Sequence, residues 1–331
     1  GASVVNALSS WLGGEVKDGT HIYKQRFEKG NIVNNLEIVG DTTETGTKVT
    51  FKPDPTIFTD TTTYDYDILL QRLREQAFLN AGIRVVLTDK RTGVTPRSDD
   101  LHFEGGIKNY VEYLLEKTGK ERLIDDVIYL SGTKDDSSVE IALIWSTSYS
   151  SNIISFANTI HTVDGGTHET GFKASLTSTV NDYGLRFKHL KESDSKPSTV
   201  DICEGITAVV SVKLVDAQFE SQTKAKLGNT DIGKFVRAIV KEKLGQYLEE
   251  NPAKAKIIME KSIASSNARE AAQKALQATR SKSTLGGRTR MPEKLTDCIS
   301  NDPTKTEIYI VEGDSAGGSA VEGRNATYQA I

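Results

Sequence analysis

Two carboxylates, Glu312 and Asp314, follow a short apolar run near the C-terminal end of the sequence. The run, residues 307–311, is typical of a strand buried on both faces of a parallel sheet. Small residues and glycines occupy 313–320, where they allow a sharp turn and the close approach of another group. Ligands of open α/β sheets collect at the carboxyl ends of strands, and Mg²⁺ prefers carboxylate oxygens. The stretch is therefore a candidate for metal-dependent phosphoryl transfer, with Glu312 near the attacking or leaving oxygen.

Two other interpretations of this stretch remain open. Residues 313–317 fit G-x-S-x-G, the pattern of a serine nucleophile, with Ser315 at its centre. In α/β-hydrolases the histidine base follows the serine, and no His follows Ser315. The order in which the histidine precedes belongs to all-β surroundings, which this sequence does not predict. The plainest interpretation is a tight strand-to-helix turn with two solvated acids.

Residues 311–320 read Val-Glu-Gly-Asp-Ser-Ala-Gly-Gly-Ser-Ala. They resemble the first strand and turn of the Toprim domain in the B subunits of bacterial type II DNA topoisomerases. The similarity runs over ten consecutive positions and is specific. It implies that Glu312 is a catalytic residue and a Mg²⁺ ligand. Val321 and Glu322 depart from the family, which has a Lys-Gln pair there, so a negative residue replaces a positive one.

Composition is that of an ordinary globular protein. The 331 residues are 37% hydrophobic and 26% charged, enough for about two or three domains. No apolar run is long enough to cross a bilayer, and no signal peptide is visible. Cys203 and Cys298 are far apart, which argues against a disulfide framework and fits a cytoplasmic location. The net charge of −4 gives no hint of nucleic-acid binding, so any DNA contact must be local.

The ends of the sequence favour a fragment of a longer protein. The chain starts at Gly1, not Met, inside what is predicted to be a helix start, and stops at Ile331 soon after a strand-turn signal. A glycine before a helix N-terminus presents free N–H groups and the helix dipole to anions, although it is commonly only a cap.

Residues 20–58 alternate in the manner of strands. Their expected inward-facing set is Ile22, Phe27, Val33, Leu36, Ile38, Val49 and Phe51. Thr47 follows a glycine between two such strands, where a hairpin turn is the simplest expectation. Residues 67–80 predict an amphipathic helix, 83–89 a strand, and 90–100 a polar loop that marks a domain boundary.

This N-terminal part resembles the C-terminal part of the GHKL ATPase domain of the same subunits. The resemblance implies that Gly1 and Ala2 belong to the glycine-rich lid over ATP, and that Thr47 lines the adenine pocket. The family's remaining ATP motifs are missing from this sequence. Residues 12–16 are glycine-rich where the family runs a longer strand, and Lys17 stands where an Arg is usual.

Residues 103–214 alternate between helix and strand patterns. A helix is predicted through about residue 117, and strands over 126–130, 139–146, 153–160 and 206–214. Residues 164–169, Asp-Gly-Gly-Thr-His-Glu, predict a turn that enters a helix. His168 has no second His or Cys at metal-ligand spacing, so we expect a capping or packing residue.

Residues 219–228 resemble the transducer loop whose Gln and Lys reach the ATP site. Alone, a lysine in such a loop predicts only a solvated charge. The resemblance implies that Gln222 and Lys224 contact the γ-phosphate, and Lys is a compact charge suited to a terminal phosphate.

Two long helices follow, at residues 231–251 and 253–280, separated by Asn251-Pro252. The basic residues after them predict either a solvated connector or a DNA contact. They are Arg280, Lys282, Arg288, Arg290 and Lys294.

The resemblance implies an α+β and α/β multidomain fold. Residues 1–100 would be the C-terminal part of a GHKL ATPase domain, and residues 101–280 a transducer domain with a ribosomal-protein-like fold and a long exit helix. Residues 281–305 would be a basic linker, and 306–331 the truncated start of a Toprim domain.

The function implied is that of an ATP-dependent type II DNA topoisomerase B subunit, most similar to the gyrase branch, which drives strand passage and negative supercoiling. Its cofactors would be ATP and Mg²⁺. Its partners would be DNA, the A subunit in an assembly of two A and two B subunits, and a second B subunit on ATP binding, with no membrane. The fragment alone would be inactive. The alternatives are a topoisomerase IV B subunit and a GHKL chaperone or mismatch-repair ATPase, which has no reason to carry a Toprim strand.

Overall fold

The protein is described by a computed structural model that covers residues 1–285 and 295–331. The side chains of residues 278–285, 314 and 315 lie outside the described part as well. All five basic residues of the expected linker therefore fall on undescribed residues or side chains. The chain forms two compact units, Gly1–Tyr110 and Val111–Ile331.

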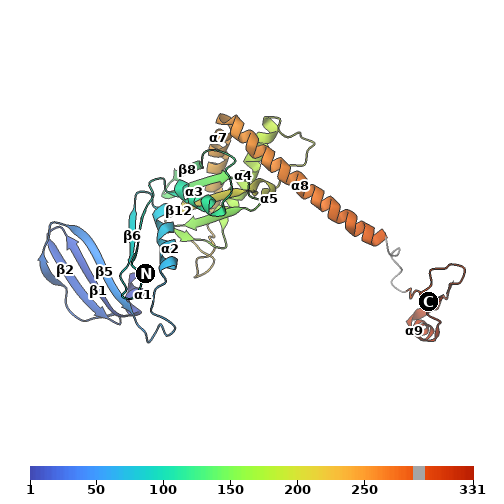
Figure 1. Ribbon diagram of the computed structural model, residues 1–331, viewed down its shortest axis with the longest axis horizontal. Helices are drawn as coiled ribbons and strands as arrows, with labels where there is room; N and C mark the ends of the chain where they lie inside the picture. The colour runs from blue at the N-terminus through green and yellow to red at the C-terminus, as the bar shows by residue number, and fades with distance from the viewer. Residues whose placement is uncertain (286–294) are drawn as a thin grey trace. The chain divides into compact units, whose positions relative to one another are not determined.

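The first unit begins with a short helix and a five-stranded antiparallel sheet (Figure 1). Its elements are α1 (Ala2–Ala7), β1 (Ser9–Asp18), β2 (His21–Glu28), β3 (Asn31–Ile32), β4 (Glu37–Asp41) and β5 (Thr45–Pro53). The order is β3-β2-β1-β5, and β4 also pairs with β2. Strand β1 runs through Gly13 and Gly14 without a break, because β2 and β5 pair with it on both sides. Residues 12–16 are therefore a continuous part of this strand despite their glycines.

The apolar residues of this sheet are more exposed than the alternation predicts. Ile22 and Phe27 are half-buried, but the other five residues of the expected inward set are exposed: Val33, Leu36, Ile38, Val49 and Phe51. Alternation identifies the apolar face of a strand, but burial requires a second layer over that face.

The rest of the first unit is a helix packed on a hairpin. Helix α2 (Tyr66–Leu79) begins at Asp65, whose carboxylate accepts hydrogen bonds from two backbone N–H groups of the first turn. Strands β6 (Arg84–Asp89) and β7 (Arg97–His102) pair antiparallel, and Tyr66, Leu70, Ala77 and Leu101 form the buried cluster between helix and hairpin. The expectation of a loop at 90–100 is therefore wrong for residues 97–100, which belong to β7. These residues are polar because the hairpin is exposed.

Helix α3 (Ile107–Thr118) follows a short turn. Phe78 of α2 stacks on Phe103 and on Tyr110, with ring centroids 3.8 and 4.7 Å apart. The stack fixes α2 against the start of α3.

The second unit is built on a mixed sheet in the order β11-β10-β12-β9-β8. The strands are β8 (Ile128–Lys134), β9 (Ser137–Trp145), β10 (Asn152–Ala157), β11 (Ile160–His161) and β12 (Ile206–Lys213). Strand β12 is buried over nearly its whole length and pairs parallel with β10. Helix α4 (Thr167–Arg186) lies between these two strands in sequence, as parallel pairing requires.

Helices cover this sheet and continue beyond it. They are α5 (Thr199–Cys203), α6 (Thr230–Ile239), the π-helix η1 (Val240–Leu244), α7 (Gly245–Glu250) and α8 (Pro252–Leu285). Proline starts α8, where its missing N–H costs nothing. The first half of α8 packs on α5, while residues 271–277 are exposed and extend away from the sheet (Figure 1). No helix within the described ranges is long and apolar enough to span a membrane.

The last described segment, residues 295–331, contains β13 (Glu307–Ile308), α9 (Gly313–Gly323) and β14 (Gln329–Ala330). Strands β13 and β14 are parallel, and Arg324 donates hydrogen bonds to the carbonyl oxygens of Thr296, Asp297 and Gln329. The expectation of a buried strand over 307–311 is wrong here, since Ile308 and Ile310 are 61% and 93% exposed. Within the described part only β14 pairs with β13, and no second sheet neighbour covers the run.

Candidate functional site

Thr47 lies within β5, not in a hairpin turn. It pairs with Val16 of β1, and Gly46 pairs with Lys17. Period-two alternation puts Thr47 on the same face as Val49 and Phe51. Thr47 also lines a small pocket of about 240 Å³ together with Glu15, Lys17, Glu44, Thr45, Gly46 and Lys48.

Three of the four charged residues that line this pocket are paired, and Lys48 has no ion-pair partner among the described residues. Lys17 Nζ lies 2.6 Å from a carboxylate oxygen of Glu44, and this hydrogen bond raises the pKa of Lys17 and lowers that of Glu44. Glu15 accepts a charge-assisted bond from Lys24 at 3.1 Å, which lowers its pKa. Glu15 and Glu44 are therefore neutralised by Lys24 and Lys17 next to Thr47.

Gly1 and Ala2 stand at the start of α1. The Gly1 carbonyl accepts hydrogen bonds from the N–H groups of Val4 and Val5, which are the first bonds of the helix. The N–H groups that precede Val4 are not donors in these helical bonds. Helix α1 joins β1 at Ser9, whereas Thr47 pairs seven residues further along, about 23 Å of strand. Gly1 and Thr47 therefore belong to opposite ends of β1.

An apolar cavity of about 260 Å³ lies where α1 meets the end of β5. Its lining includes Val4, Val5, Leu8, Phe51 and Phe58, and its wall continues through residues 61–64. Sequence reasoning did not predict this cavity, because the helix and the wall contribute residues that are far apart in the chain.

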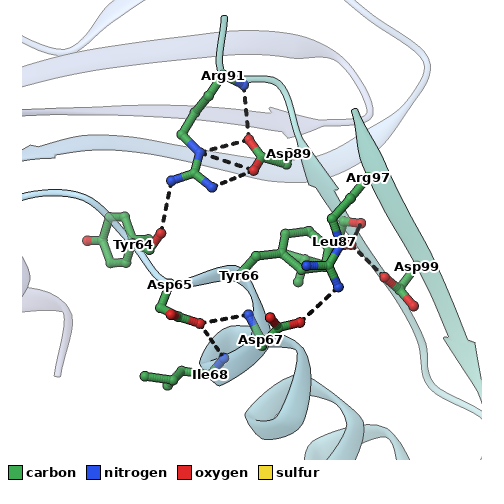
Figure 2. Close-up of polar contacts among 10 residues, drawn as sticks. All are labelled: Tyr64, Asp65, Tyr66, Asp67, Ile68, Leu87, Asp89, Arg91, Arg97 and Asp99. Carbon is green, nitrogen blue, oxygen red and sulfur yellow. Dashed lines mark hydrogen bonds and ion pairs between the residues drawn. The ribbon is translucent and has the colours of Figure 1, made fainter. Parts of the chain in front are cut away.

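An arginine from the β6–β7 hairpin holds the wall of this cavity (Figure 2). Arg91 holds the carboxylate of Asp89 with two nitrogens and donates a 3.0 Å bond to the carbonyl oxygen of Tyr64. The hydrogen bonds from Arg91 lower the pKa of Asp89 to about 2. Asp89 therefore stays ionised well below neutral pH, and Arg91 keeps its ion-pair partner there.

A second contact holds the start of α2 to the same hairpin (Figure 2). The Tyr66 hydroxyl donates a 2.7 Å bond to Asp99, and the guanidinium of Arg97 lies 4.1 Å above the Tyr66 ring. Arg97 also donates a 2.8 Å bond to Asp67. Burial of Tyr66 raises its pKa, so the hydroxyl remains a donor.

Gln222 and Lys224 lie at the tip of an exposed loop between β12 and α6. Lys224 has a left-handed backbone, with φ of 57°, and its N–H donates to the Ser221 carbonyl. Its ammonium lies 5.8 Å from the centre of the Phe219 ring. Lys226, two residues on, is paired with Glu220 at 3.0 Å. Among the described residues, no carboxylate lies within ion-pair distance of Lys224.

Glu312 stands at the N-cap of α9, directly before Gly313, whose φ is 77°. Its side chain makes no capping hydrogen bond and is exposed. The side chain of Asp314 lies outside the described part. Within the described residues, no three His, Cys, Asp or Glu side chains come together as a metal cage. Glu312 therefore fits the role of a single open carboxylate ligand, which is how Mg²⁺ is commonly held beside a phosphate.

His168 is buried and structural. Its Nε2 lies 3.1 Å from the Thr162 hydroxyl, and burial lowers its pKa to about 4, against an opposing effect of Glu169. This confirms the expectation of a packing residue. Cys203 and Cys298 are both free and buried.

Comparison with known proteins identifies the family. A family profile described as DNA gyrase B matches residues 106–278, just over half of the chain. Over its full length the chain is 53% identical to the DNA gyrase B protein of Clostridium acetobutylicum and covers 51% of that protein. The chain belongs to the DNA gyrase B family. It spans about half the length of the curated relatives it matches.

Solved structures agree with this placement in the gyrase B family. The ATPase domain of Thermus thermophilus gyrase B, solved with an aminocoumarin, matches with a TM-score of 0.73 and 38% identity, over 84% of this chain and 74% of that one. The topoisomerase IV ATP-binding domain of Francisella tularensis, solved with a small-molecule inhibitor, gives 0.68 and 29%, over 81% and 72%. The higher identity to gyrase B means that the topoisomerase IV alternative is not favoured.

Proposed function

We propose that this chain is part of a gyrase B protein that binds ATP and couples it to the passage of one DNA duplex through another. The partners would be DNA, gyrase A subunits in an assembly of two A and two B, and a second B subunit that dimerises on ATP binding. Family membership supports the proposal, together with curated relatives that carry the name of DNA gyrase B. The site of action would be the cytoplasm.

The domain assignment is part of the proposal. Residues 1–100 would complete a GHKL ATPase domain, and residues 101–280 would form the transducer with its exit helix. Residues 281–305 would be a linker, and 306–331 would begin a Toprim domain. The first unit holds an antiparallel sheet and the second a mixed sheet. This supports two separate domains, one that would bind the nucleotide and one that would transmit its state.

Lys224 would report the γ-phosphate of ATP. The single observation that carries this is a lysine held at a loop tip in a left-handed conformation, with no described carboxylate to neutralise it. An unpaired ammonium suits the doubly charged terminal phosphate of ATP. Gln222 would bind beside it, Thr47 would contact the adenine, and Gly1 and Ala2 would approach the phosphates through backbone N–H groups.

Glu312 would hold Mg²⁺ and act at the scissile DNA phosphate. A bound Mg²⁺ there would polarise a phosphate oxygen and stabilise the charge that develops on it. The carboxylate of Glu312 is exposed and is not used to cap α9, so it is available either to ligate the ion or to take a proton from the attacking oxygen.

A matched pair of lysine substitutions tests the role of Lys224. Lys224→Ala, in a gyrase B protein of the relatives' full length, removes a charge-assisted contact and should lower ATP hydrolysis about 10- to 100-fold. Lys226→Ala removes a charge from the same loop and should change hydrolysis little, because that charge already pairs with Glu220. DNA cleavage without ATP should persist in both. Equal hydrolysis by the two variants would place Lys224 on a merely solvated loop.

A further inference from the structure

The Lys224 loop is attached by its backbone to the turn that precedes α4. Asp164 N–H donates to the Ala225 carbonyl at 2.9 Å, and Leu227 N–H donates to the Gly165 carbonyl at 3.2 Å. Thr167 N–H donates to the Leu227 carbonyl at 3.1 Å. Leu227 is fully buried at this junction. The descending arm of the loop therefore has a fixed register against residues 164–167.

Gly166 is required for this junction. Its φ of 143° is a conformation that residues with a side chain rarely adopt. A β-carbon at this position would lie 2.5 Å from the carbonyl oxygen of Leu227 and 2.7 Å from its nitrogen. Both contacts are with backbone, so a larger residue could be accommodated only if Leu227 moved away. Leu227 is three residues from Lys224, and the tip would move with it.

The base of the loop is closed by Asn229, the N-cap of α6. Its side-chain oxygen accepts a 2.7 Å bond from Gln218 N–H, and its side-chain nitrogen donates a 2.9 Å bond to the Asp216 carbonyl. The hydroxyl of Thr167 donates to the Asn229 carbonyl at 2.5 Å. The same α4 turn therefore holds both the descending arm and the base of the loop.

Buried polar contacts fix the turn from its other side. Gly165 N–H donates to the Thr162 carbonyl at 2.9 Å, and the Thr162 hydroxyl lies 2.8 Å from the Ser155 hydroxyl. Ser155 donates a 2.7 Å bond to Glu169 in the first turn of α4. Because β10 supplies Ser155, the turn is tied to the central sheet and not only to the loop.

We propose that Gly166 and Thr167 are positioning residues for Lys224. They fix the loop to the sheet and to α4. The Lys224 ammonium is thereby positioned to bind the terminal phosphate of a nucleoside triphosphate. This inference rests on the proposed function of Lys224. It adds that the affinity for the γ-phosphate depends on the glycine-threonine turn, which itself touches no nucleotide.

The test measures the γ-phosphate contribution in isolation. In a gyrase B protein of the relatives' full length, the affinity for the non-hydrolysable analogue AMP-PNP is divided by the affinity for ADP. Lys224→Ala should reduce this ratio about 10- to 100-fold, since only the triphosphate loses a contact. Gly166→Ala should reduce it about tenfold or more, with ADP affinity nearly unchanged.

Gly205→Ala is the matched control for Gly166→Ala. Gly205 also has a positive φ, 77°, and a β-carbon there would meet the Ser146 carbonyl oxygen at 2.4 Å. It lies in the same unit, directly before β12. The atoms that its β-carbon would meet do not belong to residues 216–229. It should lower the melting temperature comparably and leave the affinity ratio unchanged.

A milder pair keeps the test decisive if Gly166→Ala does not fold. Thr167→Val removes the hydroxyl with little change of shape and should lower the ratio about fivefold, whereas Thr167→Ser keeps the donor and should restore it. An unchanged ratio in Thr167→Val, or equal ratios in Gly166→Ala and Gly205→Ala, would overturn the inference if Lys224→Ala still lowered the ratio. An unaffected ratio in Lys224→Ala would instead overturn the proposed function itself.

Discussion

Arg269 of α8 donates two hydrogen bonds, each 2.8 Å long, to the two carboxylate oxygens of Asp201 in α5. Asp201 is 1% exposed and also closes a capping box with Ser198. Burial alone would raise the pKa of Asp201, but the bonds from Arg269 and Ser198 outweigh it and lower the pKa to about 2. This pair fixes the last packed turns of α8 to the body of the second unit.

We expect Arg269→Ala to lower the free energy of unfolding by about 3 kcal/mol, because it leaves a buried carboxylate without its partner. Arg186→Ala is the control. Arg186 pairs with Glu249 between exposed side chains, where loss of the pair should cost less than about 1 kcal/mol. Urea unfolding monitored by circular dichroism measures both. Similar losses in the two variants would show that the contact with Asp201 is only a surface ion pair.

His168 should make stability depend on pH. Its pKa is about 4 in the folded protein and about 6.5 in the unfolded chain, so the unfolded chain binds the proton first as pH falls. The free energy of unfolding should therefore decrease as the pH falls from 6.5 to 4, by about 3 kcal/mol in total. Above pH 6.5 the neutral histidine should make its full contribution to stability. Unfolding curves at several pH values measure the slope.

His168→Gln should flatten that part of the pH profile, whatever its effect on stability at pH 7. A His168→Gln protein with the wild-type slope would mean that other groups produce the dependence.

The Cys203 thiol should be inert in the folded protein. Burial raises its pKa to about 11, which lowers the thiolate fraction at pH 8 by about 100-fold relative to a free cysteine. A thiol reagent such as DTNB should react with Cys203 only after unfolding, and comparison with Cys203→Ser assigns the slow phase. Rapid labelling of the native protein at this position would contradict the burial seen at α5.

The sequence predicts elements better than it predicts layers. The amphipathic pattern at 67–80 and the β-branched run at 206–214 produce α2 and β12 nearly as expected, because local periodicity reports the face that packs. Gly13 and Gly14 stand in a continuous strand, because pairing on both sides overrides their low strand propensity. The exposed Ile310 shows the converse limit, since an apolar run is buried only where neighbours cover it.

In the candidate site, too, the sequence predicts individual residues but not the tertiary contacts that hold them. Lys224 and Glu312 could be singled out by residue type and resemblance, but the contacts that hold Lys224 could not. Gly166 was expected only to turn the chain into α4. Its partner, Leu227, is some sixty residues away in the sequence, and that pairing is set by the tertiary fold.

Glu312 provides the sharpest test of the proposed cleavage site. Glu312→Gln keeps the shape of the side chain and removes its charge. If the carboxylate holds Mg²⁺ or moves a proton at the scissile phosphate, DNA cleavage and religation by the complete enzyme should fall together, by about 100-fold, and each should need more Mg²⁺.

Glu322→Gln is the control for this change, because Glu322 is also exposed on α9 and carries the same charge. It should leave cleavage near the wild-type level at every Mg²⁺ concentration. ATP hydrolysis should change little in both variants, since we place the nucleotide in another domain. A cleavage assay titrated with Mg²⁺ separates the outcomes. If Glu312→Gln and wild type cleave equally at equal Mg²⁺, residues 312–317 are a strand-to-helix turn with a solvated acid, and the catalytic carboxylate must be sought elsewhere.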